Sequence, residues 1–70
     1  MATVHVHKDG LFTRRNEYEV DDLTVEQAID ALIDPTNMGG KVTYRRDLIG
    51  WVDGSVEVMI DGEPYIIITD

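Results

Sequence analysis

Two histidines near the start of the chain, in the stretch TVHVHK, are the side chains best suited to binding a metal ion. His5 and His7 are two positions apart, so on a β-strand both point to the same face. Glu17 or Glu19 could add a carboxylate from the other strand of a hairpin. Zinc would need a further ligand within reach, and the sequence signals none. We therefore favour a solvent-facing histidine pair over a metal site, and we expect no cofactor.

Arginines supply most of the few positive charges. Four of the six basic residues form two adjacent pairs, Arg14–Arg15 and Arg45–Arg46. Neighbouring residues on a strand point to opposite faces, so each pair offers one guanidinium to each side. Two such groups on nearby strands could bind a carboxylate or a phosphate. Because acidic residues outnumber basic ones by 14 to 6, we favour ion pairs within the chain over this anion site.

The glycines of NMGGKVTYRR could belong to a phosphate-binding loop. Such a loop needs a strand before it and a helix N-terminus after it. Gly39 and Gly40 instead follow a predicted helix and precede a predicted strand. We interpret them as a helix-to-strand turn that requires a positive φ angle.

Nothing in the sequence marks a catalytic centre. Fourteen acidic residues make carboxylate pairs easy to draw, but no nucleophile lies in a recognisable context. The absence of cysteine excludes disulfides, thiolate zinc sites and cysteine nucleophiles. Seventy residues form one domain, residues 1–70, whose thin core leaves little room for a deep pocket. We predict that the protein is not an enzyme.

The strongest functional signal is a row of carboxylates on a predicted helix. Its members follow a four-residue spacing or flank the helix start: Asp21, Asp22, Glu26, Asp30 and Asp34. Residues four apart stack along one helix face. Like charges at this spacing destabilise a helix, and yet no lysine or arginine lies between residues 16 and 40. We predict a surface for a basic partner; the alternative is that the charge only keeps the protein soluble.

Alternating apolar and polar residues predict the strands that hold these side chains. Val4 and Val6 alternate with the histidines, and Tyr18 and Val20 with the glutamates, with the valines and the tyrosine facing inward. The two runs predict a hairpin with its turn at residues 8–10.

The helix has clear start and stop signals. Thr24 as N-cap and Gln27 three residues later predict a capping box. One buried stripe with helical spacing follows, formed by Val25, Ala28, Ile29 and Leu32. Pro35 disfavours helical geometry at the residue before it, so we expect the helix to end at Ile33.

The last part of the chain predicts further strands. KVTYRR and SVEVMI both alternate, and Asp61–Gly62 favours a two-residue type I′ turn before YIIIT. DLIGWVDG is either a short strand ending in a turn or a loop held by Trp51. The order of hairpin, helix and two or three further strands predicts an α+β domain, with one helix covering a mixed or antiparallel sheet.

The stretch ATVHVHKDGLFTRRNEYEVDDLTVEQAIDALI resembles the opening of a ubiquitin-like β-grasp domain: a hairpin, an acidic turn and a capped helix. The resemblance implies a sheet of four to five strands packed on one helix. The conjugating and sulfur-carrying members of that family act through a C-terminal Gly-Gly. This chain ends in IIITD and its glycine pair is internal. The resemblance therefore implies a docking role and not carrier chemistry.

The net charge of −8 and the pI of about 4.4 favour a basic protein partner. The same charge repels nucleic acid and anionic membranes. No apolar run approaches the roughly 18 residues of a membrane span. No signal-peptide core opens the chain, so we expect a cytoplasmic location in the producing or host cell.

We predict a small acidic inhibitor or regulator that mimics nucleic acid and occludes a basic, nucleic-acid-binding surface of a partner. Trp51 would anchor it through an apolar patch. In size and charge the chain resembles phage-encoded anti-defence proteins, such as anti-CRISPR proteins. The alternatives are an accessory or carrier-like β-grasp subunit of a larger complex, a metal- or phosphate-binding domain that uses His5, His7 or the arginines, and a homo-oligomer that pairs through YIIIT if that strand is an edge. The acidity itself could instead reflect adaptation to high salt.

Overall fold

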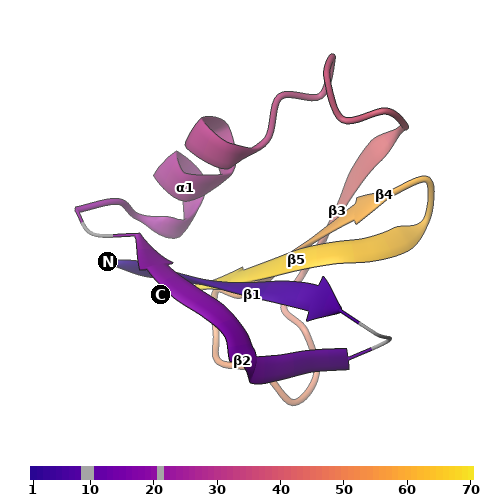
Figure 1. Cartoon of the computed structure of the whole chain (residues 1–70). Coiled ribbons are helices and arrows are strands. Elements are labelled where there is room, and N and C mark those ends of the chain that lie inside the picture. The colour runs from indigo at the N-terminus through magenta and orange to yellow at the C-terminus, as the bar shows by residue number, and fades with distance from the viewer. Residues whose placement is uncertain (9–10, 21) are drawn as a thin grey trace.

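The computed structural model describes residues 1–8, 11–20 and 22–70, and for residues 11–15 it describes the backbone alone. The elements are β1 (Ala2–Lys8), β2 (Leu11–Val20), α1 (Val25–Leu32), β3 (Val42–Arg46), β4 (Val56–Ile60) and β5 (Glu63–Thr69) (Figure 1). The predicted order of hairpin, helix and further strands is confirmed. The predicted turn at residues 8–10 falls largely outside the described residues.

The strands form one sheet in the order β2-β1-β5-β4-β3, and every neighbouring pair is antiparallel. The α+β class is therefore confirmed. β5, which contains YIIIT, lies at the centre of the sheet, so it is not an edge at which a second copy could pair. No helix in the described part of the chain is both long and apolar enough to cross a membrane.

The core lies between α1 and the face of the sheet that the helix covers (Figure 1). Its buried members are Ala2, Val4, Ala28, Ile29, Ile33, Val56, Val58, Ile66 and Ile68. The strand members alternate with side chains on the other face, as the two-residue period requires. Fully burying each large aliphatic side chain stabilises the fold by about 1.5–3 kcal/mol.

Local signals set the helix ends as expected. The Thr24 hydroxyl accepts from the Gln27 amide at 3.2 Å, and the Gln27 side chain accepts from the Thr24 amide at 2.9 Å, which completes the capping box. The helix ends at Leu32, one residue earlier than we expected. Ile33 is the C-cap, and its amide still donates to the Ile29 carbonyl at 2.9 Å.

Both predicted turns after the helix are confirmed. Asp61 and Gly62 have φ angles of 52° and 79°, as a type I′ turn requires. Gly39 has a φ of 77°. Gly40 lies so close to Asp61 that an added Cβ would come within 2.4 Å of its carboxylate. The glycine pair is thus a turn packed against the next hairpin.

One inward assignment is wrong. Tyr18 pairs with the buried Val4 across the hairpin and so shares its face of the sheet, but it is 47% exposed. β2 is an edge strand, so it has a neighbouring strand on one side alone. Sharing the covered face therefore does not ensure burial at the sheet's margin.

Candidate functional site

The acidic row predicted from the sequence lies on the solvent side of α1 and at its two ends. Asp22, Glu26, Asp30 and Asp34 are all exposed, and Asp21 lies outside the described residues. Among the described residues, none forms a hydrogen bond or an ion pair with the carboxylates of Asp22 and Asp30. Within the described part of the chain, these two charges contribute no contact to the fold.

Glu26 does have a partner. Arg46 reaches from the end of β3 and donates from Nη1 and Nη2 to the two carboxylate oxygens of Glu26, the second at 3.4 Å. The hydrogen bond from Arg46 lowers the pKa of Glu26 and raises that of Arg46. The predicted pairing of arginines with acids is therefore confirmed for Arg46. This pair ties the first turn of α1 to the sheet.

Asp34 serves the turn that follows the helix. Its carboxylate accepts from the Thr36 amide at 3.0 Å, the Thr36 hydroxyl at 2.6 Å and the Asn37 side-chain amide at 2.7 Å. The hydrogen bonds from Thr36 lower the pKa of Asp34. Its charge remains exposed, but its oxygens stabilise local structure.

A hollow of about 350 Å³ extends the acidic surface at the helix N-terminus. Its lining combines one guanidinium with three carboxylates: Thr24, Val25, Glu26, Arg46, Asp53, Gly54 and Asp70. Sequence reasoning missed Asp53 and Asp70, because only the tertiary fold brings a β-turn and the end of β5 beside the helix. The hollow has the charge to accept a cationic side chain.

On the face of the sheet away from α1, one row of directly paired residues crosses all five strands. From β2 to β3 the row reads Glu17, His5, Ile67, Glu57 and Arg45. Arg45 Nε lies 3.8 Å from Glu57 Oε1. Arg45 thus contacts Glu57 on the face away from α1, whereas Arg46 contacts Glu26 of α1. The adjacent arginines 45 and 46 therefore point to opposite faces, as predicted. The side chains of Arg14 and Arg15 are outside the described part of the structure.

His5 makes a polar contact through each of its ring nitrogens. Its Nδ1 lies 3.2 Å from Glu17 Oε2, and its Nε2 lies 3.2 Å from the Thr69 hydroxyl. Trp51 packs edge-on against the imidazole, with ring centroids 5.0 Å apart. No group of three or more histidine, aspartate or glutamate side chains in the described residues could hold a metal ion. The His5 side chain is 16% exposed, so it does not face solvent as we expected.

The β3–β4 loop, residues 47–55, covers part of this face. It consists of two consecutive turns, closed by hydrogen bonds from Trp51 N to Leu48 O and from Ser55 N to Val52 O. Gly50 and Gly54 take the positive φ angles in these turns. DLIGWVDG is thus a loop, the second of our two alternatives.

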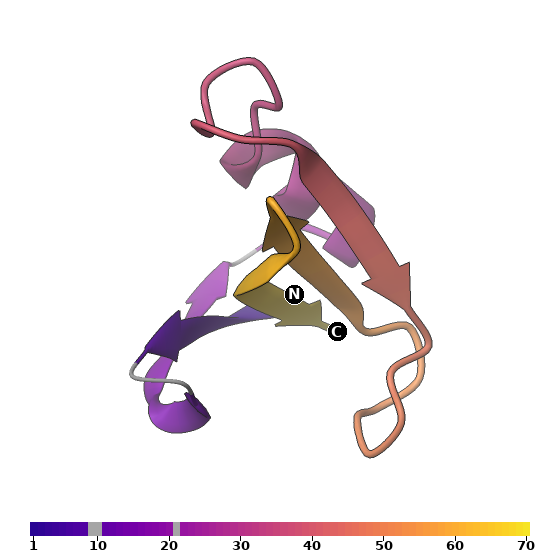
Figure 2. The ribbon, with the colours of Figure 1, turned by 90° about the vertical axis from the view of Figure 1, so that its right-hand side faces the viewer.

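The two turns leave two apolar side chains of the loop half-buried and two exposed. Leu48 and Trp51 are half-buried, whereas Ile49 is fully exposed and Val52 is largely so. Figure 2 shows most of this loop on the side of the sheet away from α1, and Trp51 packs there on His5, whereas Asp53 and Gly54 line the hollow beside the helix. The acidic helix and Trp51 therefore do not form one continuous patch.

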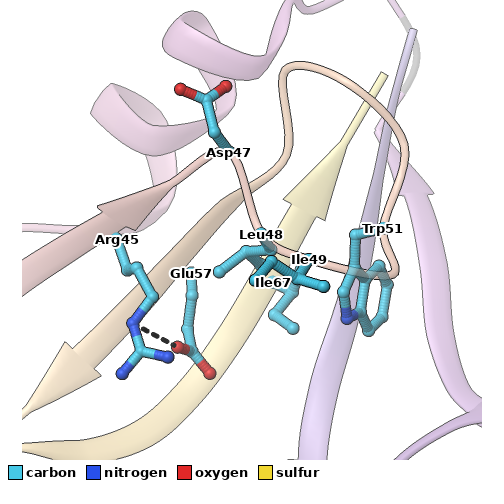
Figure 3. Close-up of a pocket in the computed structure, with 7 residues that line it drawn as sticks. All are labelled: Arg45, Asp47, Leu48, Ile49, Trp51, Glu57 and Ile67. Carbon is cyan, nitrogen blue, oxygen red and sulfur yellow. Dashed lines mark ion pairs between the residues drawn. The ribbon is translucent and has the colours of Figure 1, made fainter.

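A second hollow, of about 370 Å³, lies beneath the loop (Figure 3). Its lining residues are Arg45, Asp47, Leu48, Ile49, Trp51, Glu57 and Ile67.

No family model, curated protein or solved structure matches the chain. Geometry and charge alone must therefore support a functional assignment.

Proposed function

We propose that the chain is a small acidic protein-binding module that occludes a basic surface of a partner. The observation that carries the proposal is the exposed acidic side of α1. There the carboxylates of Asp22 and Asp30 stand without partners among the described residues. A fold that used these charges for its own stability would pair them. Unpaired charges on a rigid, capped helix suit an electrostatic interface.

The hollow at the helix N-terminus supports the same proposal. Glu26, Asp53 and Asp70 share its lining with Arg46, so the lining carries net negative charge. A lysine or arginine of the partner could enter it and compete with Arg46 for carboxylate oxygens. A partner that binds nucleic acid would present such residues in number, and the chain would then act as its inhibitor or regulator.

The test is a pull-down from lysate of the source cell or its host at low and high salt. The variant Asp22→Asn/Asp30→Asn removes two negative charges without breaking a contact in the described structure. Asparagine also tolerates the φ of 62° at position 22. The matched control is Glu19→Gln/Glu63→Gln, because both of these side chains are exposed and lie off the helix.

We expect a basic protein that wild type and control retain at low salt and that the helix variant loses. High salt should release it from all three, because charge complementarity is screened. Equal capture by both variants would contradict the proposal.

A second candidate is an accessory subunit of a larger complex, the docking role that the β-grasp resemblance implies. It is favoured by the exposure of Ile49 and Val52, which are neighbours on one loop. Binding through these side chains would tolerate high salt. Ile49→Ser would abolish such capture, whereas the helix variant would leave it unchanged.

A further inference from the structure

The hollow beneath the β3–β4 loop combines an apolar wall with a charged end (Figure 3). Ile67 is buried at its floor, and Leu48, Ile49 and Trp51 come from the loop above. Glu57 and Arg45 lie together at one end, with Trp51 beyond the aliphatic side chains at the other. The hollow stands on the face of the sheet away from α1, so it is separate from the acidic helix.

Glu57 is the unusual member of the lining. It is 8% exposed, and the described residues offer it a single charged contact, Arg45 Nε at 3.8 Å. That separation exceeds the length of a hydrogen bond. The Glu57 side chain keeps 10% exposure, and its oxygens are not among the fully buried atoms without a partner, so the carboxylate is still accessible. The carboxylate therefore has capacity for a donor that enters the hollow.

The charges of the lining select the sign of that donor. Glu57 is the one acid whose carboxylate lies among these side chains, because the Asp47 carboxylate points away from them (Figure 3), and Arg45 is the one cation of the lining. The Arg45 side chain is 65% exposed, so it can turn toward solvent while a ligand occupies its place. A ligand with a long aliphatic stem would cover Ile67 and Leu48, and its cationic head could reach Glu57 at the charged end of the hollow.

We propose that this hollow binds the side chain of an arginine presented by a partner protein. Its guanidinium donates to the Glu57 carboxylate, and its methylene groups pack on the aliphatic wall. Ile49 of the lining and Val52 of the same loop are both exposed, and they would contact apolar residues that flank the arginine. The arginine meets the two needs of the site, since it neutralises the buried carboxylate and fills the apolar space.

Trp51 is the one tryptophan of the chain, so its fluorescence reports on this hollow directly. The probe is the blocked peptide Ac-Gly-Arg-Gly-amide. Two matched peptides replace arginine with citrulline, which is neutral and of the same shape, and with glutamate. We expect a saturable change in Trp51 emission with the arginine peptide and at least roughly tenfold weaker binding of the citrulline peptide, given the strength of charged hydrogen bonds.

Variants separate this site from the acidic helix. Glu57→Gln keeps the side-chain shape and should abolish the preference for arginine over citrulline, whereas Glu63→Gln and Asp22→Asn/Asp30→Asn should retain it. Circular dichroism checks that Glu57→Gln folds, and the peptide comparison on wild type stands whether or not it does. The proposal is overturned if citrulline binds as well as arginine, if the glutamate peptide is preferred, or if no peptide gives a saturable change.

Discussion

The two faces of the sheet bury their side chains by different means. On the face under α1, the buried side chains of the strands are all apolar, from Ala2 and Val4 on β1 to Ile66 and Ile68 on β5. On the other face the buried residues include Ser55, Glu57 and Thr69. A loop covers part of that face instead of a helix. The covered face supplies the apolar core, whereas the open face, over which only a loop lies, also buries polar groups.

The largest effect should come from truncating a buried side chain on the covered face. Ile68→Ala removes a fully buried side chain from the centre of the core, and we expect a loss of about 2–5 kcal/mol in the free energy of unfolding. Ile67→Ala should cost less, because Ile67 already borders a hollow on the open face. Urea denaturation measures both. The exposed Ile49→Ala serves as control, and an Ile67 effect larger than that of Ile68 would contradict the division.

The next-largest effect should come from removing the contacts that His5 makes on the open face. His5→Leu leaves the buried Thr69 hydroxyl without its partner and removes the ring contact with Trp51. We expect a loss of about 1–3 kcal/mol. We also expect a red shift of Trp51 emission, as the indole moves toward water. His7→Leu, on the same strand, is the comparison, and an unchanged emission maximum in His5→Leu would show that His5 does not hold the loop.

Ser55 should respond in the opposite direction. Its hydroxyl is fully buried and has no hydrogen-bond partner among the described residues. Ser55→Ala removes the unsatisfied oxygen with little change of volume, so we expect stability to stay unchanged or to rise by about 1 kcal/mol. Thermal melting measures it. A clear loss of stability would mean that the hydroxyl makes a contact important to the fold.

The smallest effect is a pH dependence on the helix side. Hydrogen bonds from Arg46 and Thr36 lower the pKa values of Glu26 and Asp34 below their ordinary 4.5 and 3.8. The unfolded chain therefore binds more protons, and this stabilisation is present above those values and lost as pH falls through the lowered ones. Both groups are exposed, so the effect is small and weakens with salt.

Urea denaturation at several pH values between 6 and 3 measures this dependence, because that range spans the ordinary carboxyl pKa values of about 4. Glu26→Gln should lose less stability on acidification than wild type. Glu19→Gln, an exposed glutamate off the helix, should follow the wild-type curve. Parallel curves for wild type and Glu26→Gln would mean that the ion pair between Glu26 and Arg46 does not stabilise the fold.

The sequence predicted the elements that depend on local chemistry. The capping box needs Thr24 and Gln27, three residues apart, and the type I′ turn needs adjacent Asp61 and Gly62. The alternation of Val4 and Val6 with the histidines placed the covered face correctly.

Contacts between distant parts of the chain were beyond such reasoning. The pairing of Glu26 with Arg46, and the packing of Trp51 on His5, depend on strand order and register. The sequence therefore could not show that Trp51 lies on the face opposite the acidic helix. Nor could it show that Asp53 joins the helix N-terminus in a hollow, because a β-turn in the sequence gives no sign of its neighbours.

The central claim is that the position of the acidic charges, and not their number, determines binding. The direct measurement is the affinity of an arginine-rich peptide, such as nonaarginine, for wild type, Asp22→Asn/Asp30→Asn and Glu19→Gln/Glu63→Gln by titration calorimetry at two salt concentrations. Both variants lose the same charge. We expect the helix variant to bind far more weakly than the control at low salt, with the difference shrinking at high salt. Equal weakening of both variants would show that only net charge matters, and it would contradict the proposed interface on α1.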